Sequence, residues 1–312
     1  MIDKFKRYLK KALFLFRKML VKEKYATLVH VDGGICSQMY QYVVGYAMAN
    51  QNRNVMYDLS WFKKYGKDMN GEYIYNFDLL KLFPNLDIHI ADDKMCREYN
   101  IVSSFFPKSD SEKITMCSNR IPSEPVLMQS YYWIDEKTYK IYPSLFKIDL
   151  NNIVDFSVEN QKMANKIMKD DNSVGVHVRR GDMASTTGFW IQLGPDYFIN
   201  AIKLFDIETT HFYFFSQDLD WVEKNIVSKI DGLKSTLVDI NDSEHGYCDL
   251  ALLSLCKNQI ASQGSFGGVA SILNSNKDKI LVLPKVEGGF KYHPKACKWE
   301  DVTEAMVWYA EI

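Results

Sequence analysis

Three charged residues follow a short run of β-branched residues in the middle of the chain. Residues 174–183 read VGVHVRRGDM, which places Arg179, Arg180 and Asp182 where a strand should end in a loop. Side chains alternate between the two faces of a strand, so His177 and Arg179 should share one face and Arg180 should point to the other. An arginine at the end of a buried strand can offer a bidentate contact to a phosphate. We therefore predict that Arg179 binds phosphate, whereas for Arg180 we favour an ion pair that braces the loop.

Two later turns carry residues suited to the same ligand. The sequence SQGSFGGVAS places Ser265 at the N-cap of a predicted helix, followed by Phe266, and the first N–H groups of such a helix can hold an anion. The run FFSQD ends at Asp218, which could pair with the N–H edge of a guanine or simply cap the next helix. Asp-Leu-Asp at residues 218–220 also has the form of a metal-binding motif. We expect no metal there, because the motif begins a helix and the arginines already supply positive charge.

Alternating strands and helices must position these turns. In the first half of the chain, apolar patterning predicts strands at residues 26–32, 54–60, 86–91 and 126–133. In the second half it predicts strands at residues 173–179, 211–216, 235–240, 258–262 and 279–284, separated by helices. This alternation indicates α/β domains with parallel, doubly wound sheets, in which ligands bind at the carboxyl ends of the strands. The charged turns should therefore converge.

The chain is long enough for two domains. Its 312 residues are 47% hydrophobic, which is more than one domain would comfortably hold. We predict a basic amphipathic helix over residues 1–24, an N-terminal domain over residues 25–155 and a C-terminal domain over residues 156–312.

Composition argues against several classes of function. The formal net charge of −1 gives the molecule no field of the kind that nucleic-acid binding needs, so we expect no nucleic-acid partner. The six cysteines form no C-x-x-C pair, which favours reduced thiols in the cytoplasm over a disulfide framework or a structural zinc site.

The first 24 residues are strongly basic. They hold nine Lys and Arg residues against Asp3 and Glu23, and Phe5, Leu9 and Leu20 recur at helical spacing. The uncharged stretch is far shorter than the roughly 20 residues of a membrane span, and it is too short for a signal peptide. We expect residues 1–22 to bind the surface of an anionic membrane. The alternative is a helix that packs its apolar stripe on the protein body.

Taken together, the motifs resemble a known family. HxRRGD, the GG-x-x-x-QM-aromatic-QY turn at residues 33–42, an FS-x-D strand end and a Ser-Phe turn opening a late helix occur in the order seen in glycosyltransferase family 11, the α-1,2-fucosyltransferases. The resemblance covers roughly residues 26–285. It implies two facing Rossmann-like domains, the GT-B arrangement, with an N-terminal acceptor domain and a C-terminal domain that binds a GDP-sugar without metal.

The resemblance also implies roles for individual residues. His177 and Asp218 would contact the nucleoside, and Arg179 would neutralise the β-phosphate. The remaining residues would hold the pyrophosphate (Ser265, Phe266), support the strand end (Arg180, Asp182) and close over the sugar (Gly33, Gly34, Gln38).

The chain departs from the family at three places. It has Cys36-Ser37-Gln38 in place of Gly-Asn-Gln, Gln217-Asp218 in place of two aspartates, and Gly267-Gly268 in place of tryptophans. These departures leave two alternatives to a GDP-fucose donor. One is another GDP-deoxysugar such as GDP-colitose, and the other is a catalytically silent protein that binds sugar nucleotide or glycan.

The expected reaction is an inverting transfer of L-fucose from GDP-fucose to a hydroxyl, forming an α-1,2 linkage to O2 of a galactose in a surface glycan. Asp32 is our first candidate for the general base and Asp182 the second, although both could instead stabilise loops. The expected acceptor is an oligosaccharide or a lipid-linked glycan of O-antigen type, and the expected location is the cytoplasmic face of a bacterial inner membrane.

Overall fold

The structure is a computed structural model of the 312-residue chain. It describes residues 4, 5, 8, 9, 12, 27–49, 54–67, 71, 73–97, 127–128, 136–180, 192–287 and 291–298. Most of the predicted basic helix and the candidate base Asp182 therefore lie outside the described residues. None of the helices within these ranges is long and apolar enough to cross a membrane.

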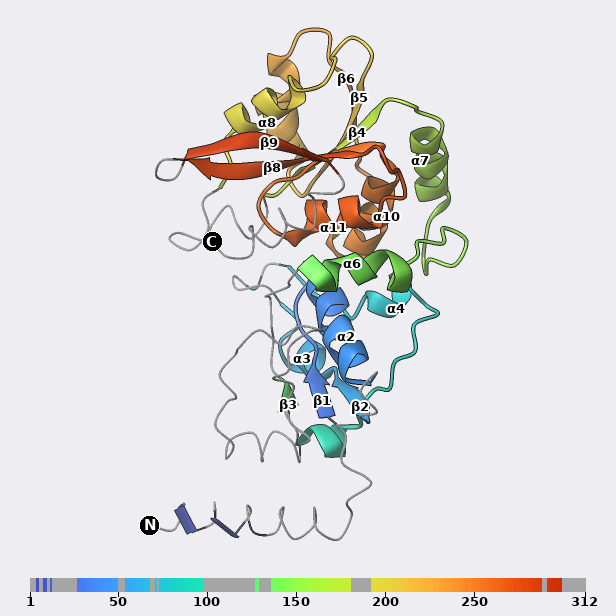
Figure 1. The fold of residues 1–312 in the computed structure, drawn as a ribbon, viewed down its shortest axis with the longest axis vertical. Helices are drawn as coiled ribbons and strands as arrows, with labels where there is room; N and C mark the ends of the chain where they lie inside the picture. The colour runs from blue at the N-terminus through green and yellow to red at the C-terminus, as the bar shows by residue number, and fades with distance from the viewer. Residues whose placement is uncertain are drawn as a thin grey trace. The chain divides into compact units, whose positions relative to one another are not determined.

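The chain divides into two compact units, each an α/β structure (Figure 1). The first unit comprises residues 1–66 and 87–134, and the second comprises residues 67–86 and 135–312.

The first unit is built on a three-stranded parallel sheet with the order β2-β1-β3. Its strands are β1 (Thr27–His30), β2 (Val55–Asp58) and β3 (Leu127–Met128), and its helices include α2 (Ile35–Ala49) and α3 (Ser60–Lys64). Val29 pairs with both Tyr57 and Met128, so β1 is the central strand. The strand predicted over residues 86–91 is reduced to a single parallel bridge between Ile90 and Tyr57.

The second unit contains a six-stranded sheet with the order β6-β5-β4-β7-β8-β9. Its strands are β4 (Ser173–Val178), β5 (His211–Ser216), β6 (Lys234–Leu237), β7 (Asn258–Ile260), β8 (Ile280–Glu287) and β9 (Lys291–Lys298). All neighbouring pairs are parallel except β8 with β9, an antiparallel hairpin that the sequence analysis did not predict. Its helices are α4 (Leu79–Leu82), α6 (Glu136–Leu145), α7 (Val158–Met168), α8 (Pro195–Ile202), α9 (Leu219–Asn225), α10 (Gly246–Leu255) and α11 (Ser265–Leu273), with short 3₁₀ turns η2 (Val227–Lys229) and η3 (Ser243–His245).

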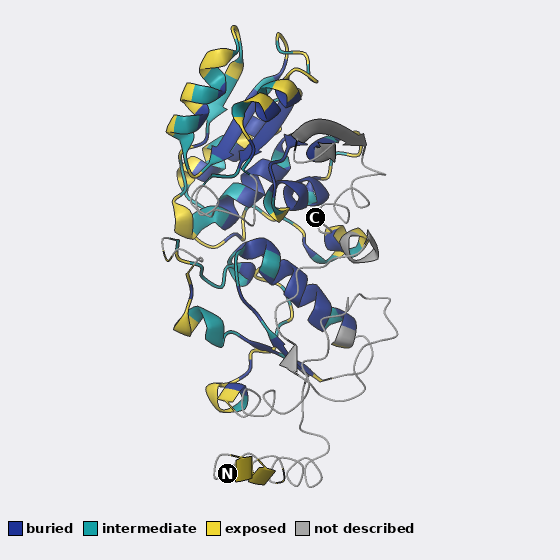
Figure 2. Ribbon diagram, turned by 90° about the vertical axis from the view of Figure 1, so that its left-hand side faces the viewer, coloured by how far each residue is buried: buried dark blue, intermediate teal, exposed yellow. Residues whose placement is uncertain are grey.

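Strand β4 lies at the centre of this sheet, and all six of its residues are buried (Figure 2). Val174, Val176 and Val178 belong to a core cluster that includes residues of α8 and α9. On the opposite face, Gly175 lies so close to Leu253 of α10 that a Cβ atom on it would come within 2.4 Å of the leucine side chain. A strand covered by helices on both faces must be apolar throughout, which explains the run of β-branched residues before Arg179.

Local signals set where the helices of the second unit begin. Ser157 caps α7, because its hydroxyl accepts a hydrogen bond from the Asn160 N–H at 3.1 Å. Pro195 occupies the first position of α8, where the missing N–H costs nothing. Both signals are readable in the sequence.

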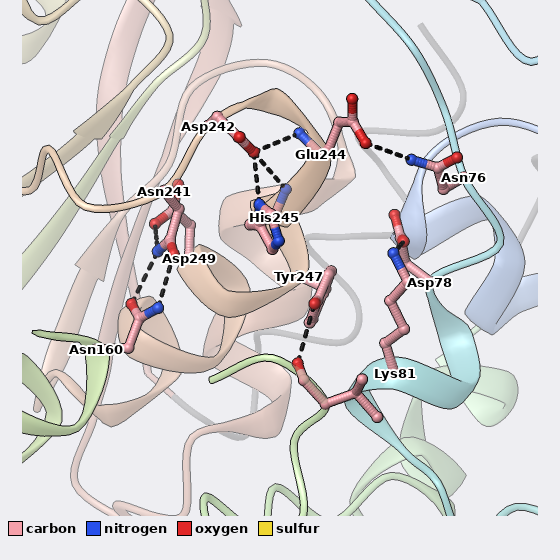
Figure 3. A network of polar contacts seen from close by, with 11 residues as sticks. Asn76, Asp78, Lys81, Asn160, Asn241, Asp242, Glu244, His245, Tyr247 and Asp249 are labelled. Carbon is pink, nitrogen blue, oxygen red and sulfur yellow. Dashed lines mark hydrogen bonds and ion pairs between the residues drawn. The ribbon is translucent and has the colours of Figure 1, made fainter. Parts of the chain in front are cut away.

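The division between the units differs from the predicted domains. Residues 67–86 and 135–155 were assigned to the N-terminal domain, but the structure groups them with the second unit. Val154 N–H donates to Lys81 O at 2.9 Å, and the Tyr247 hydroxyl of α10 donates to Val154 O at 3.0 Å. The Lys81 ammonium also lies 5.2 Å from the centre of the Tyr247 ring (Figure 3). Periodicity predicts that such a segment is a helix or a strand, but not which sheet it packs against.

Candidate functional site

The strand order of the second unit reverses between β4 and β7. Strands β4, β5 and β6 run to one side of this point, and β7 and β8 run to the other. In an open α/β sheet the connections on the two sides diverge there, and the carboxyl ends of the two central strands form the usual ligand site. Arg179 and Arg180 follow β4, and the turn of residues 261–264 follows β7. The structure therefore brings together two of the motifs identified in the sequence.

The hydroxyl of Ser262 joins the two strand ends. Arg179 N–H donates to Ser262 Oγ at 2.9 Å, and Ser262 Oγ lies 3.3 Å from His177 Nδ1. The same hydroxyl also lies 3.5 Å from Gln263 O, to which it can donate. One side-chain oxygen therefore links the ends of both strands.

The surroundings of His177 keep it uncharged. Its side chain is buried, and burial together with the positive charge of Arg179 lowers its pKa to about 3. The positive charge at this strand end therefore comes from arginine, while His177 is neutral near pH 7.

Helix α11 packs closely against His177. The ring centroids of His177 and Phe266 lie 4.9 Å apart, and the angle between the two ring planes is 33°. A Cβ atom on Gly267 would lie 2.7 Å from Ala261 Cβ, 3.0 Å from Ala261 Cα and 3.4 Å from His177 Cβ. At Gly267 the helix therefore contacts the strand end, and no side chain fits there. Gly267 is also one of the departures from the family pattern.

The start of α11 differs from the prediction by one residue. Ser265 is the first residue of the helix, and the N-cap is Gly264, whose φ of 95° favours glycine. Gly264 has no side chain that could accept from the N–H groups of the first turn. Those N–H groups, together with the helix dipole, can still bind an anion, as predicted for Ser265 and Phe266.

Arg180 and Asp218 meet on the other side of the strand end. The Arg180 guanidinium lies 4.1 Å from the centre of the Trp221 ring, and its Nε is 4.0 Å from Asp218 Oδ2. Asp218 Oδ1 accepts the Trp221 N–H at 3.0 Å and so caps α9. This geometry favours the bracing role for Arg180 and the capping role for Asp218 over pairing with guanine.

The predicted residues of the first unit are bonded to one another around the β1–α2 turn. Asp32 N–H donates to Gln41 Oε1 at 3.0 Å, and Gln41 Nε2 donates back to Asp32 Oδ1 at 2.8 Å. Gln38 Nε2 donates to the carbonyl of Gly33 at 2.9 Å, and Gly33 has a φ of 70°. Gly34 follows and precedes α2. These contacts fit the loop-stabilising alternative for Asp32, and its role as general base stays a prediction, as does that of Asp182.

Two residues of the second unit were missed by the sequence analysis. Ser262 carried no signal beyond its place after a predicted strand. Asp249, on α10, accepts a 2.7 Å hydrogen bond from Asn241, which in turn exchanges hydrogen bonds of 2.7 and 2.9 Å with Asn160 (Figure 3). Burial raises the pKa of Asp249 to about 7, although the bond from Asn241 opposes this shift. A lone acid in the otherwise apolar helix GYCDLALLSL was the available signal.

Acid should destabilise the protein through His177. The folded state holds the pKa of His177 at about 3, whereas an unfolded histidine titrates near 6.5, so only the unfolded state is protonated between these values. The stabilisation is complete above about pH 6.5 and is lost as the pH falls below it. We expect the free energy of unfolding to fall by about 1.4 kcal/mol per pH unit in this window from His177 alone.

Urea unfolding of the wild type and of His177→Gln at about pH 7 and about pH 5 measures this contribution. The variant should lose less stability on acidification. His89→Gln removes a histidine whose side chain is 71% exposed and serves as the matched control. Equal pH dependence in the wild type and His177→Gln would show that His177 is protonated in the folded protein.

Comparison with known proteins assigns the chain to a family. The sequence pattern of "Glycosyl transferase family 11" matches residues 82–300. An alpha-1,2-colitosyltransferase of Escherichia coli is 25% identical over 277 residues, which cover 82% of this chain and 90% of the relative. The O-antigen biosynthesis glycosyltransferase WbnK of Escherichia coli is 28% identical over 124 residues, 38% of this chain and 40% of the relative.

A solved structure supports the fold. The fucosyltransferase NodZ from Bradyrhizobium superposes with a TM-score of 0.50 at 11% identity, covering 88% of this chain and 99% of NodZ. This likeness, with the parallel strands at the centre of both sheets, confirms the predicted fold class of Rossmann-like α/β domains. Since the family pattern spans more than half of the sequence, the chain belongs to glycosyltransferase family 11.

Proposed function

We propose that this protein is an inverting, metal-independent glycosyltransferase that moves L-fucose from GDP-fucose to a hydroxyl of a surface glycan, forming an α-1,2 linkage to galactose. The observation that carries the proposal is the site between β4 and β7. There, the backbone of Arg179 is bonded to Ser262, and the turn containing Ser262 leads directly into α11. An arginine and a helix N-terminus at one topological switch point suit a diphosphate.

The chemistry follows from where charge develops. As the bond from the sugar C1 to the diphosphate breaks, positive charge grows on the sugar and negative charge grows on the β-phosphate. Arg179 and the first N–H groups of α11 would stabilise the departing phosphate without having to reorient. The acceptor hydroxyl attacks C1 from the opposite face, and a carboxylate, Asp32 or Asp182 in our proposal, takes its proton.

The names of the relatives support a GDP-sugar donor. NodZ is described as an alpha-1,6-fucosyltransferase and was crystallised with GDP. The relative that this chain matches over 90% of its length is named a colitosyltransferase, which makes GDP-colitose the specific alternative. Fucose and colitose differ by one hydroxyl group, so a small change in the donor site is enough to exchange them.

Replacing Arg179 should remove most of the activity. We expect Arg179→Ala to lower the rate of transfer from GDP-fucose by about 10²–10³-fold, because one charge-stabilising donor is lost. EDTA should leave the rate unchanged, since in this proposal the arginine and helix neutralise the phosphate without a metal. Lys203→Ala removes an exposed cation at the end of α8 as the matched control. Wild-type activity in Arg179→Ala, or loss of activity with EDTA, would overturn the assigned mechanism.

A panel of GDP-sugars should identify the donor. We expect product formation with GDP-fucose, scored by product mass on galactose-terminated acceptors. Transfer from GDP-colitose alone would establish the alternative donor. Tight binding of GDP with no turnover of any donor would favour the catalytically silent alternative.

We further propose that residues 1–22 bind the anionic cytoplasmic face of a bacterial inner membrane, where a lipid-linked glycan acceptor would be found. Phe5, Tyr8 and Leu9 are 69%, 64% and 53% exposed, which favours this role over packing on the protein body. Spaced three and four residues apart, they lie on one side of a helix.

Flotation with liposomes tests the membrane contact. We expect the full chain to float with vesicles that contain anionic lipid and not with purely zwitterionic ones. Deleting residues 1–22 should abolish flotation. An unchanged bound fraction after the deletion would exclude this segment as the membrane contact.

A further inference from the structure

Gln263 is a buried polar side chain in the turn between β7 and α11. It follows Ser262 and precedes Gly264, the N-cap of α11. The residue is only 5% exposed, and among the residues that the structure describes neither its Nε2 nor its Oε1, both buried, has a hydrogen-bond partner. A buried amide with neither of its polar atoms bonded is rare in native proteins and costs stability.

A second buried glutamine, four residues earlier, shows how the same fold satisfies such a group. Gln259 Nε2 donates to Cys256 O at 2.8 Å and to Leu253 O at 3.2 Å, and its Oε1 accepts from Asn274 at 3.2 Å. Gln259 is therefore bonded entirely within the protein, whereas the amide of Gln263 has no such bond within the part of the chain that the structure describes. The difference points to a ligand that completes the hydrogen bonds of Gln263.

The position of Gln263 narrows the chemistry of that ligand. The turn that contains it joins Ser262, which is bonded to Arg179, to the N-terminus of α11, where we propose that the diphosphate binds. A phosphate oxygen only accepts, so it could satisfy Nε2 but not Oε1. A hydroxyl both donates and accepts. In a sugar nucleotide, the two groups bonded directly to the diphosphate are the ribose and the transferred sugar, and both carry hydroxyls.

We propose that Gln263 is a donor-binding residue whose amide forms hydrogen bonds with hydroxyls of the sugar nucleotide. This inference rests on the proposed function and extends it with a recognition residue that the family resemblance did not indicate. The protein keeps an unsatisfied amide in the absence of ligand and gains its hydrogen bonds on binding, which makes Gln263 a determinant of donor affinity.

Gln263→Met, which keeps the size of the side chain and removes its polar atoms, tests the proposal with two measurements. The thermal midpoint of the ligand-free variant should equal or exceed that of the wild type, because an unsatisfied buried amide is removed. The Kd for GDP-fucose, measured by calorimetry, should rise about tenfold. Gln259→Met is the matched control, and it should lower the thermal midpoint and leave the Kd unchanged.

The source of the hydroxyls follows from a comparison of GDP with GDP-fucose. An equal loss of affinity for both assigns Gln263 to the ribose, and a loss for GDP-fucose alone assigns it to the transferred sugar. Wild-type affinity of Gln263→Met for both ligands would overturn the proposal, as would a lowered thermal midpoint with unchanged affinity. If the wild type and Gln263→Met bind GDP-fucose equally well, only the inference about Gln263 fails. If the wild type binds neither GDP nor GDP-fucose, the proposed function is refuted as well.

Discussion

The arrangement of the strand ends at the switch point between β4 and β7 depends on one serine hydroxyl. Ser262 Oγ accepts from the backbone of Arg179 and contacts the ring of His177, so a single group ties the end of β7 to the end of β4. The two strands are adjacent in the sheet, but their ends are separated by 83 residues of sequence. The pairing of parallel strands alone does not set the direction of the chain after β4. The hydrogen bond from Arg179 N–H to Ser262 Oγ fixes it.

The packing of α11 makes the same strand ends rigid from another direction. Gly267 lets the helix approach Ala261 and the Cβ of His177, and Phe266 covers the imidazole ring. A larger residue at position 267 would push the helix away and with it the N–H groups that the proposal assigns to the diphosphate. At this position, where the sequence analysis noted a departure from the family pattern, the close contact with Ala261 leaves no room for a side chain.

The two arginines after β4 illustrate how one motif serves two purposes. The charge of Arg179 acts on His177 and, with burial, lowers the pKa of this histidine, which keeps it neutral. Arg180 lies instead against Trp221 and Asp218. Asp218 is in turn the cap of α9, so the second arginine braces the start of a helix while the first is placed at the site.

Much of this organisation follows from the sequence by itself, because strand alternation, caps and apolar periodicity are local. They were enough to predict the parallel α/β fold, the start of α8 at Pro195, and the family from the order of its motifs. Contacts between distant segments were beyond their reach. The assignment of residues 67–86 to the second unit, the tie through Ser262, the ion pair of Arg180 with Asp218 and the unsatisfied amide of Gln263 were decided by tertiary structure. Each depends on which strand or helix meets another across tens of residues, and a periodic pattern sets the face a side chain occupies but not the partner it finds there.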